Sequence, residues 1–534
     1  MKTITIFKRK VNIALLSAVV VLAGAAGCKK GTFDINGTNP NSPSTVLPKY
    51  SLSASLSGTA NLMYSAIGTF NNGSTIPVGG NQDMINNWMG YWTQSGAYTP
   101  SNTYVLYQLT SSTASGNWDA AYNNLSNYHT LITSTSADAT LVNYRAIAMM
   151  MTAFVYQRIV DLYNKAPYTG ALVANSTFSY KYDDGATIYK ACIAKIDSAV
   201  ALIKANPGAT SPGGYDVMFG GDMSMWVKFG NTLKLKMLMR QTASSANGSL
   251  GDAGVAAALL NNPGNSGKPY TAADFLGAGE DATVNPGYSS AADNQENPLF
   301  IDVVTTSTNN PGYNEKYFRA NAYGVSFYQN HNDPRLAMLY LPNNAGVIQG
   351  RVYGSTLGTE ANSVISGLTG YGANASAKEG APIIPAFESL FLVAEAQQRG
   401  YIKTGSAAAS YKAGVEESFR ILGSDAATAD TYMAQNDAVA NFTLASDPIT
   451  AIITQKWAAC NSLDPLESFS DWRRLNIPAT LPVSKYPGVT VTHIPYRLPY
   501  PTSELSYNSA NVPDGGTGTE ALSMGVFWMP NISR

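Results

Sequence analysis

The sequence is poor in cysteine, histidine and charge. Its 534 residues include 3 cysteines and 3 histidines, and charged residues make up 13% of the chain. Three cysteines that lie far apart are too few for a disulfide framework. The histidines form no pair at helical spacing, and no Cys-x-x-Cys motif occurs, so we predict neither a metal site nor a cofactor.

The sequence also lacks a charge excess and recognisable catalytic motifs. The 34 Lys and Arg residues are balanced by 35 Asp and Glu residues, which gives no basic surface for nucleic acid. Gly277-Ala-Gly279 lacks the third glycine of a dinucleotide-binding loop, and no Gly-x-Ser-x-Gly elbow is present. We therefore expect a protein that is not an enzyme. The abundant Tyr, Gly, Asn and Ser residues predict a neutral polar surface, suited to uncharged partners that offer hydroxyls and CH faces.

One carboxylate pair keeps a hydrolase open as an alternative. Glu388 and Glu395 fall on one face of a predicted helix, and glycoside hydrolysis needs two carboxylates across the scissile bond. Most helix carboxylates are structural, however. We interpret Glu395 as a buried scaffold residue that pairs with Arg473 or Arg474, because an unpaired buried charge would cost several kcal/mol.

The N-terminus has the pattern of a secretory signal. A basic start precedes an apolar run over residues 11–22, and Ala25-Ala26-Gly27 stand directly before Cys28. This arrangement resembles a bacterial lipobox, so residues 1–27 are predicted to be removed and Cys28 to be lipidated. Residues 28–46, rich in Gly, Asn, Pro and Ser, would form a flexible tether to the membrane. An ordinary signal peptide with an incidental cysteine is the alternative.

Residues 47–534 are predicted to form a single, mainly α-helical domain. Apolar residues recur every three or four positions from Trp118 to Leu162, which we expect to be one long helix that ends before Pro167. Further helices over residues 47–240 and 385–480 are joined by short Pro/Gly turns. Such segments suggest stacked hairpins of the tetratricopeptide kind, although no clean 34-residue repeat is present.

Two regions depart from the helical pattern. Residues 241–384 are rich in Gly, Asn, Ser and tyrosine, and a loop region of this length is usually functional. We predict that it faces the ligand. Residues 481–534 are expected to form an extended, proline-restricted tail.

A helical hairpin near the C-terminus organises the predicted core. Asp464-Pro465 separates two predicted apolar helices. The first carries Trp457, and the second carries Trp472 and is stopped by Pro478. These tryptophans need cover from distant parts of the chain, and together with Trp118 and Trp226 we assign them to the core. Cys192 and Cys460 lie on apolar helix faces and are expected to be buried free thiols.

A series of motifs, in order along almost the whole chain, resembles the SusD/RagB family of surface nutrient-binding lipoproteins, and in particular its SusD-like branch. The resemblance implies a helical superhelix, a cell-surface position on the outer membrane and a partner TonB-dependent, SusC-like transporter. One departure is the end, Phe527-Trp528-Met529-Pro530, where relatives often carry an aromatic-Asp pair. The landmarks are Asn39-Pro40-Asn41, Tyr182-Asp183-Asp184, Gly220-Gly221-Asp222, Asn297-Pro298, Asp333-Pro334-Arg335, Ala394-Glu395-Ala396, Trp472-Arg473-Arg474 and Arg497-Leu498-Pro499-Tyr500-Pro501.

Ligand binding is predicted where these architectural landmarks are absent. Two stretches, residues 81–107 and 309–332, combine aromatic rings with planar polar groups, the mixture that binds sugars. The resemblance does not fix binding positions. The candidate ligand-binding residues are Trp88, Tyr91, Trp92, Tyr98, Tyr313, Tyr317, Arg319, Asn321 and Tyr323.

The leading hypothesis is a surface receptor that captures a glycan or oligosaccharide and passes it to the transporter. A peptide receptor of the same system is the alternative within binding proteins, and the low charge of the chain favours sugars. A surface-anchored glycoside hydrolase and a purely structural subunit of the transporter complex are the other hypotheses.

Overall fold

The computed structural model describes residues 46–64, 81–113, 115–173, 179–261, 267–292, 295–304, 315–358, 360–372, 375–513, 518 and 520–530. The predicted signal peptide and Cys28 lie outside these residues, and so does the tether, apart from Val46. The chain from Pro48 onward forms one compact unit.

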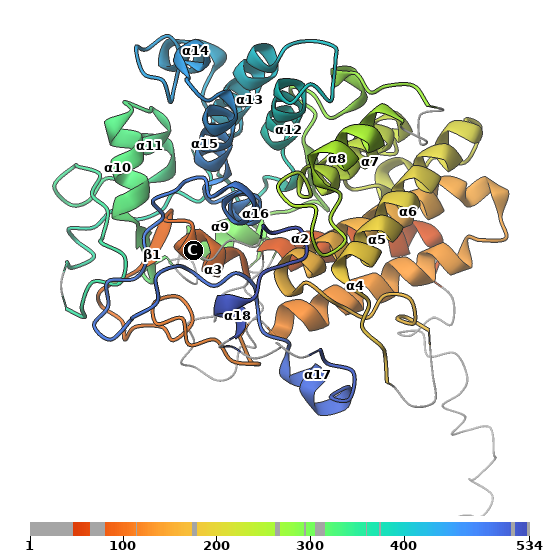
Figure 1. Cartoon of the computed structure of the whole chain (residues 1–534), viewed down its shortest axis with the longest axis horizontal. Coiled ribbons are helices and arrows are strands. Elements are labelled where there is room, and N and C mark those ends of the chain that lie inside the picture. Colours follow the sequence, from red (N-terminus) through yellow and green to blue (C-terminus); the bar gives the residue numbers. More distant parts are fainter. Residues whose placement is uncertain are drawn as a thin grey trace, which may run out of the picture. The chain divides into compact units, whose positions relative to one another are not determined.

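Helices dominate that unit, as the sequence predicts (Figure 1). In chain order the elements are α2 (Pro48–Tyr64), α3 (Asn81–Trp88), β1 (Trp92–Gln94), α4 (Ser115–Ser134), η1 (Ala139–Leu141), α5 (Val142–Tyr163), α6 (Gly185–Ala205), η2 (Gly213–Tyr215), α7 (Met223–Met239), α8 (Gly251–Leu260), η4 (Ala272–Asp274), β2 (Ala282–Val284), α9 (Pro298–Val303), β3 (Phe318–Ala320), α10 (Ala322–Asn330), α11 (Arg335–Leu339), β4 (Ala381–Ile384), α12 (Ala386–Gln398), α13 (Ala407–Ile421), α14 (Ala426–Met433), η5 (Phe442–Leu444), α15 (Pro448–Cys460), α16 (Pro465–Leu475), α17 (Thr502–Tyr507) and α18 (Glu520–Ser523).

Neighbouring helices pack in sequence order, which confirms the stacked arrangement. One stack runs from α4 through α5 and α6 to α7, and a second joins α12, α13 and α14. α15 packs on α12 and α16, so the C-terminal hairpin lies against the second stack, and α12 also contacts α7 of the first stack (Figure 1). Cys192, Cys460 and the four tryptophans assigned to the core are buried, as predicted.

Several of the family-like landmarks are helix starts. The Asp222 carboxylate accepts hydrogen bonds from the amides of Ser224 and Met225 at the start of α7. Asn297 caps α9 in the same way, with Pro298 as the first helical residue. A short acceptor side chain followed by proline is well suited to a helix N-terminus, because proline has no N–H to leave unpaired.

The long helix predicted from Trp118 to Leu162 is in fact two helices, α4 and α5. The hydroxyls of Thr135 and Ser136 donate to the carbonyls of Leu131 and Thr133, and thereby compete with the helical hydrogen bonds. Asp138 then caps the short helix η1. A Ser/Thr-rich turn can therefore interrupt a chain whose apolar spacing continues unchanged across it.

The region 241–384 is more regular than its sequence pattern indicates. It contains α8, α9, α10 and α11, and two antiparallel strand pairs involve it: β1 with β3 and β2 with β4. These helices have between 5 and 10 residues, too few turns for a clear period. The predicted tail likewise carries α17 and α18.

Candidate functional site

The short strand pair β1–β3 joins the two aromatic stretches that the sequence singles out. Thr93 pairs with Arg319, and the amide of Ser95 donates to the carbonyl of Tyr317 over 2.8 Å. Parts of the chain that are more than two hundred residues apart in sequence therefore lie side by side. The described parts of the two predicted ligand-binding stretches therefore meet at this strand pair.

Three of the predicted ligand-binding aromatic residues are buried in the core. Trp88, Tyr91 and Trp92 each have 0% of their surface exposed. The Tyr91 hydroxyl donates to the carbonyl of Trp457 over 2.6 Å, and Trp92 Nε1 donates to Ser462 Oγ over 3.1 Å. A sugar ring cannot stack on a side chain that exposes no surface, so these rings are part of the scaffold rather than the stacking surfaces expected from the sequence.

Arg319 and Asn321 are also occupied by the scaffold. The Asn321 amide donates to the carbonyl of Trp92 over 2.9 Å, and its oxygen accepts from the amide of Tyr323 at the start of α10. Arg319 Nη1 donates to the carbonyl of Glu315 over 2.8 Å, and burial lowers the pKa of its guanidinium. Both polar side chains hold the strand pair together and have little surface left for a ligand.

Tyr98 and Tyr323 are the predicted aromatic residues that retain substantial exposed surface among those the structure describes. Tyr98 packs edge-on against Tyr317 at 5.1 Å between ring centroids, and the Tyr323 hydroxyl lies 3.2 Å from Thr480 Oγ1. Tyr317 is 8% exposed, and Tyr313 lies outside the described residues. Tyr98 follows one end of the strand pair β1–β3 and Tyr323 follows the other, and we call these two partly exposed rings the tyrosine face.

The tyrosine face is shallow. The recess beside Tyr98 has a volume of about 10 Å³, roughly the space of one water molecule. A ligand bound here would lie across the surface rather than inside a closed pocket. The recess is lined by Gln94, Ser95, Tyr98, Pro100, Val105, Arg351, Gly354, Ser355 and Leu357.

A much larger hollow, of about 1050 Å³, lies elsewhere, between the start of α6 and the C-terminal residues 523–530. None of its lining residues is among the ligand-binding residues predicted from the sequence. The unusual Phe527-Trp528-Met529-Pro530 segment, which supplies part of its wall, was the one sequence signal for it. We call it the C-terminal hollow; its lining residues are Asn164, Lys165, Asp184, Gly185, Ala186, Thr187, Asn247, Gly248, Tyr496, Ser523, Met524, Gly525, Val526, Phe527, Met529 and Pro530.

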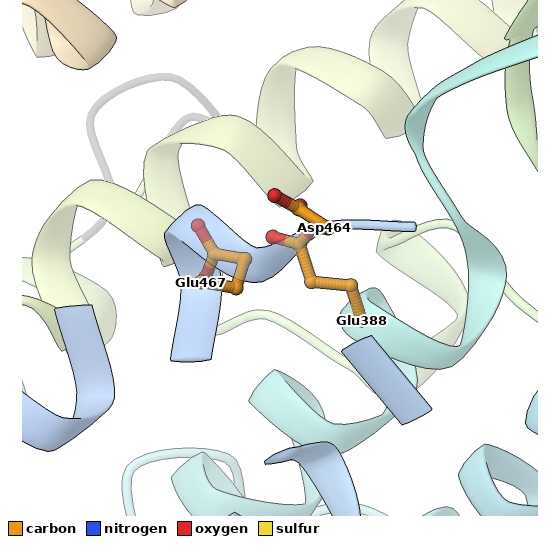
Figure 2. Close-up of side chains that lie close together, drawn as sticks. All are labelled: Glu388, Asp464 and Glu467. Atoms are coloured by element: carbon orange, nitrogen blue, oxygen red, sulfur yellow. The ribbon is translucent and has the colours of Figure 1, made fainter. Parts of the chain in front are cut away.

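Three buried carboxyl groups form a third candidate site. Oxygens of Glu388, Asp464 and Glu467 lie within 4.8 Å of one another (Figure 2). The three residues come from α12 and from the start of α16, and none is more than 1% exposed. Such a set could in principle bind a hard cation.

Ammonium groups already occupy the space beside these carboxylates. Lys236 Nζ lies 3.0 Å from Glu388 Oε1 and 2.7 Å from Glu467 Oε1, and Lys456 Nζ lies 3.1 Å from Glu467 Oε2. The guanidinium of Arg240 also contacts Glu467. The cluster is therefore built as an ion-pair network and does not fit a metal ion.

The environment divides the three carboxyls into two kinds. Burial, followed by the charge of Glu467, raises the pKa of Glu388 well above its usual range, and burial likewise raises the pKa of Asp464. Burial also opposes ionisation of Glu467, but Arg240 and the two lysines outweigh it and hold the pKa of Glu467 well below its usual range. Glu467 is the charged centre of the network, and the neutral form is favoured at Glu388.

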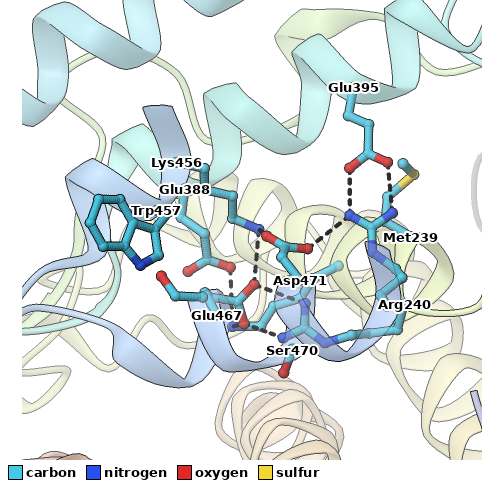
Figure 3. Close-up of polar contacts among 12 residues, drawn as sticks. Met239, Arg240, Glu388, Glu395, Lys456, Trp457, Glu467, Ser470 and Asp471 are labelled. Carbon is cyan, nitrogen blue, oxygen red and sulfur yellow. Dashed lines mark hydrogen bonds and ion pairs between the residues drawn. The ribbon is translucent and has the colours of Figure 1, made fainter. Parts of the chain in front are cut away.

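The polar network extends to Glu395 of α12 (Figure 3). Arg474 Nη1 and Nη2 donate to the two Glu395 oxygens over 2.6 and 2.7 Å, which confirms the expected pair and identifies Arg474 as the partner. Arg473 instead donates to the main-chain carbonyls of Asp161 and Tyr496. The two arginines thus hold α16 against α12, α5 and the C-terminal tail.

The comparison with known families decides the identity of the fold. A family model described as "Starch-binding associating with outer membrane" matches residues 51–501. The chain belongs to this SusD-like family. No curated protein matches the SusD-like chain at a significant level.

Solved structures similar to this SusD-like protein include three homologues. A SusD homologue from Bacteroides vulgatus has a TM-score of 0.70 and 20% identity, and the match covers 90% of this chain and 98% of that one. A SusD homologue from Bacteroides fragilis has a TM-score of 0.68 and 18% identity, with 91% and 99% covered. A chitin-binding SusD homologue from Flavobacterium johnsoniae has a TM-score of 0.68 and 22% identity, with 90% and 99% covered.

The family description places SusD-like proteins at the outer membrane. Within the described residues of this chain, no helix combines the length and the apolar character needed to span a bilayer.

Proposed function

We propose that this SusD-like protein is a lipid-anchored receptor on the cell surface, which captures a glycan and delivers it to a SusC-like TonB-dependent transporter. Membership of a family described as starch-binding carries this proposal. The structural similarity to a chitin-binding homologue supports a glycan as the ligand class. Delivery to the transporter and the anchor at Cys28 rest on the family resemblance.

The chemistry of the tyrosine face supports a neutral ligand. Tyr98 and Tyr323 offer partly exposed rings for the CH faces of a sugar. Two charged groups near Tyr98, Arg319 and Arg351, are 5% and 3% exposed and donate to main-chain carbonyls. Each also lies within 4 Å of a glutamate, Glu315 or Glu360, so their charges are paired. The shallow shape suits a polysaccharide that lies across the surface, bound through stacking and hydroxyl contacts.

A binding experiment with the mature chain, residues 29–534, tests the proposal. Carbohydrate arrays and native gels cast with chitin derivatives, starch or other polysaccharides should show retention by at least one glycan. The same incubations should release no reducing ends. Release of products would favour the surface-anchored hydrolase instead, and failure to bind any glycan would refute the receptor proposal.

Substitutions on the tyrosine face test the location of the site. Tyr98→Ala and Tyr323→Ala should together weaken glycan binding at least ten-fold, since stacking on an aromatic side chain contributes about 1 kcal/mol or more per contact. Tyr507→Ala is a matched control, because Tyr507 is 83% exposed and lies on α17, outside the tyrosine face. If the double variant binds as the wild type does, the site is misplaced.

A further inference from the structure

Arg158 of α5 is a buried cation for which the described residues offer no acceptor. The residue is 3% exposed, and none of its nitrogens, Nε, Nη1 and Nη2, has a hydrogen-bond partner among those residues. A guanidinium carries five N–H donors and keeps its charge in proteins. Buried polar groups are almost always hydrogen-bonded, and a buried charge without a partner is strongly destabilising. Arg158 therefore needs an acceptor that these residues do not supply.

Other buried arginines of the same core show the usual arrangement. Arg474 donates to both oxygens of Glu395. Arg473 donates to two main-chain carbonyls. Arg158 instead lies against the ring of Phe154, with 5.9 Å between the guanidinium carbon and the ring centre. A ring at that distance attracts the cation but leaves its N–H groups without acceptors.

The charges near Arg158 do not neutralise it. Burial lowers the pKa of Arg158, and Asp464, the carboxyl group that opposes this effect most, does not outweigh it. Neither oxygen of Asp464 accepts a hydrogen bond from the guanidinium. Glu467 and Asp161 act more weakly, and both are already paired with Arg240. The positive charge of Arg158 thus has no counter-charge in contact with it within the described part of the chain.

The ion-pair network around α16 also contains more positive than negative charge. Counted with Arg158, it has as many buried cations as buried carboxyl groups, but the neutral form is favoured at Glu388. One cation is therefore left without an ionised carboxyl group to balance it. The buried cations are Arg158, Lys236, Arg240, Lys456, Arg473 and Arg474. The buried carboxyl groups are those of Asp161, Glu388, Glu395, Asp464, Glu467 and Asp471.

A small cavity lies against Arg158, between α5, α2 and α4. Its volume is about 10 Å³, enough for one water molecule or one monatomic ion. Aliphatic side chains, among them Leu62 of α2 and Val155 of α5, form most of the wall. Asn117 of α4 adds an amide that is 4% exposed, and its side-chain oxygen has no donor among the described residues. The cavity therefore places a cation and a free amide beside a site for one small ligand.

The charge of Arg158 decides between the two ligands that fit. A water molecule would accept hydrogen bonds from the guanidinium but would leave its charge unbalanced, whereas a small anion would do both. Polyatomic anions are too large for a cavity of this size. We propose that Arg158 and this cavity bind one chloride-sized monovalent anion, a buried counter-ion that joins α5 to α2 and α4. The Asn117 amide can turn its NH₂ group towards the same anion, because no donor holds its oxygen in place. The site goes beyond the proposed receptor function and does not depend on it.

Crystals of residues 29–534 soaked in sodium bromide test the site directly, because bromide replaces chloride and scatters anomalously. An anomalous peak should appear in contact with the Arg158 guanidinium and the Asn117 amide. A water molecule without anomalous signal at this position, or bromide at exposed sites only, would overturn the proposal. This measurement uses the wild type and does not require that a variant folds.

Thermal unfolding separates the counter-ion from general effects of salt. At equal ionic strength, the wild type should unfold at a higher temperature in sodium chloride than in sodium gluconate, whose anion is too large for the cavity. Above half saturation, the midpoint should rise by about 1 °C for each tenfold increase in chloride. Arg158→Met should abolish this dependence on chloride. Arg145→Met is the matched control on the same helix and should keep it, because Arg145 donates to the carbonyl of Ser136 at the surface. Equal midpoints in the two salts, or the same chloride dependence in Arg158→Met as in the wild type, would refute the anion site.

Discussion

Replacing Glu395 by glutamine tests the buried ion pair that joins α12 to α16. The change keeps the shape of the side chain and removes its charge, so that Arg474 keeps Asp471 as its carboxylate partner at 2.8 Å. Burial disfavours the Glu395 carboxylate, but Arg474 and then Arg399 outweigh burial and lower the pKa of Glu395 from 4.5 to about 2. The ionised pair therefore stabilises the folded state.

The size of the effect follows from that shift. A difference of one pKa unit between the folded and unfolded states corresponds to about 1.4 kcal/mol. Lowering the Glu395 pKa to about 2 therefore adds about 3 kcal/mol to the free energy of unfolding at neutral pH. Because the folded-state pKa lies below the unfolded one, this stability is present above about pH 5 and is lost as the pH falls towards 2. By about pH 3 only about 1 kcal/mol should remain.

Urea unfolding of the wild type and of Glu395→Gln, monitored by circular dichroism between pH 7 and pH 3, measures the contribution of this ion pair to the free energy of unfolding. The free energy of unfolding should fall by about 3 kcal/mol at pH 7, and the difference between the two proteins should shrink on acidification. Glu416→Gln is the control, because its pair with Lys412 is exposed and should contribute at most about 1 kcal/mol. A difference that does not change with pH, or one no larger than the control, would refute the pairing argument.

Two further predictions concern the carboxyl cluster and the anchor. At pH 8, Glu388→Gln should unfold at the same urea concentration as the wild type or a higher one, because the raised folded-state pKa makes ionisation of Glu388 costly as the pH rises. Glu467→Gln should be destabilised by several kcal/mol, because it removes the charged centre of the network. A larger loss of stability in Glu388→Gln than in Glu467→Gln would contradict the conclusion that Glu467 carries the charge. Cys28→Ala should move the protein from the membrane fraction to the soluble fraction, and unchanged sedimentation with membranes would show that Cys28 is not the anchor.

Local sequence signals predicted the helical scaffold well. The spacing of apolar residues and the Asp464-Pro465 break define the hairpin α15–α16, which buries Trp457 and Trp472 as expected. The small residues around Glu395 indicated close helix packing, and its pairing with an arginine of α16 followed from the cost of a buried charge. The helices and the break between them depend on residues within one or two helical turns, whereas the Glu395–Arg474 pair joins residues 79 apart in sequence.

The burial of the aromatic stretch could not be predicted in the same way. Trp88, Tyr91 and Trp92 have the composition of a sugar site, and they are covered by segments far along the chain, including the hairpin about 370 residues later and Phe318. The strand pair that brings Tyr98 towards Tyr317 has three residues on each side, too few for an alternating pattern to stand out. Pairing at such separation is set by tertiary packing rather than by local preference.

The C-terminal hairpin supports both the tyrosine face and the C-terminal hollow, which determines how binding at the tyrosine face can be tested. Its residues accept the hydrogen bonds of Tyr91 and Trp92 beneath the tyrosine face, while Arg473 lies against Trp528 beneath the C-terminal hollow. A substitution in the hairpin would disturb both surfaces at once and could not assign a ligand to either. Loss of binding is therefore informative only for side chains that face solvent and leave the core intact. Tyr98 and Tyr323 meet this condition, because both rings are partly exposed, and variants at these positions can therefore assign a glycan to the tyrosine face.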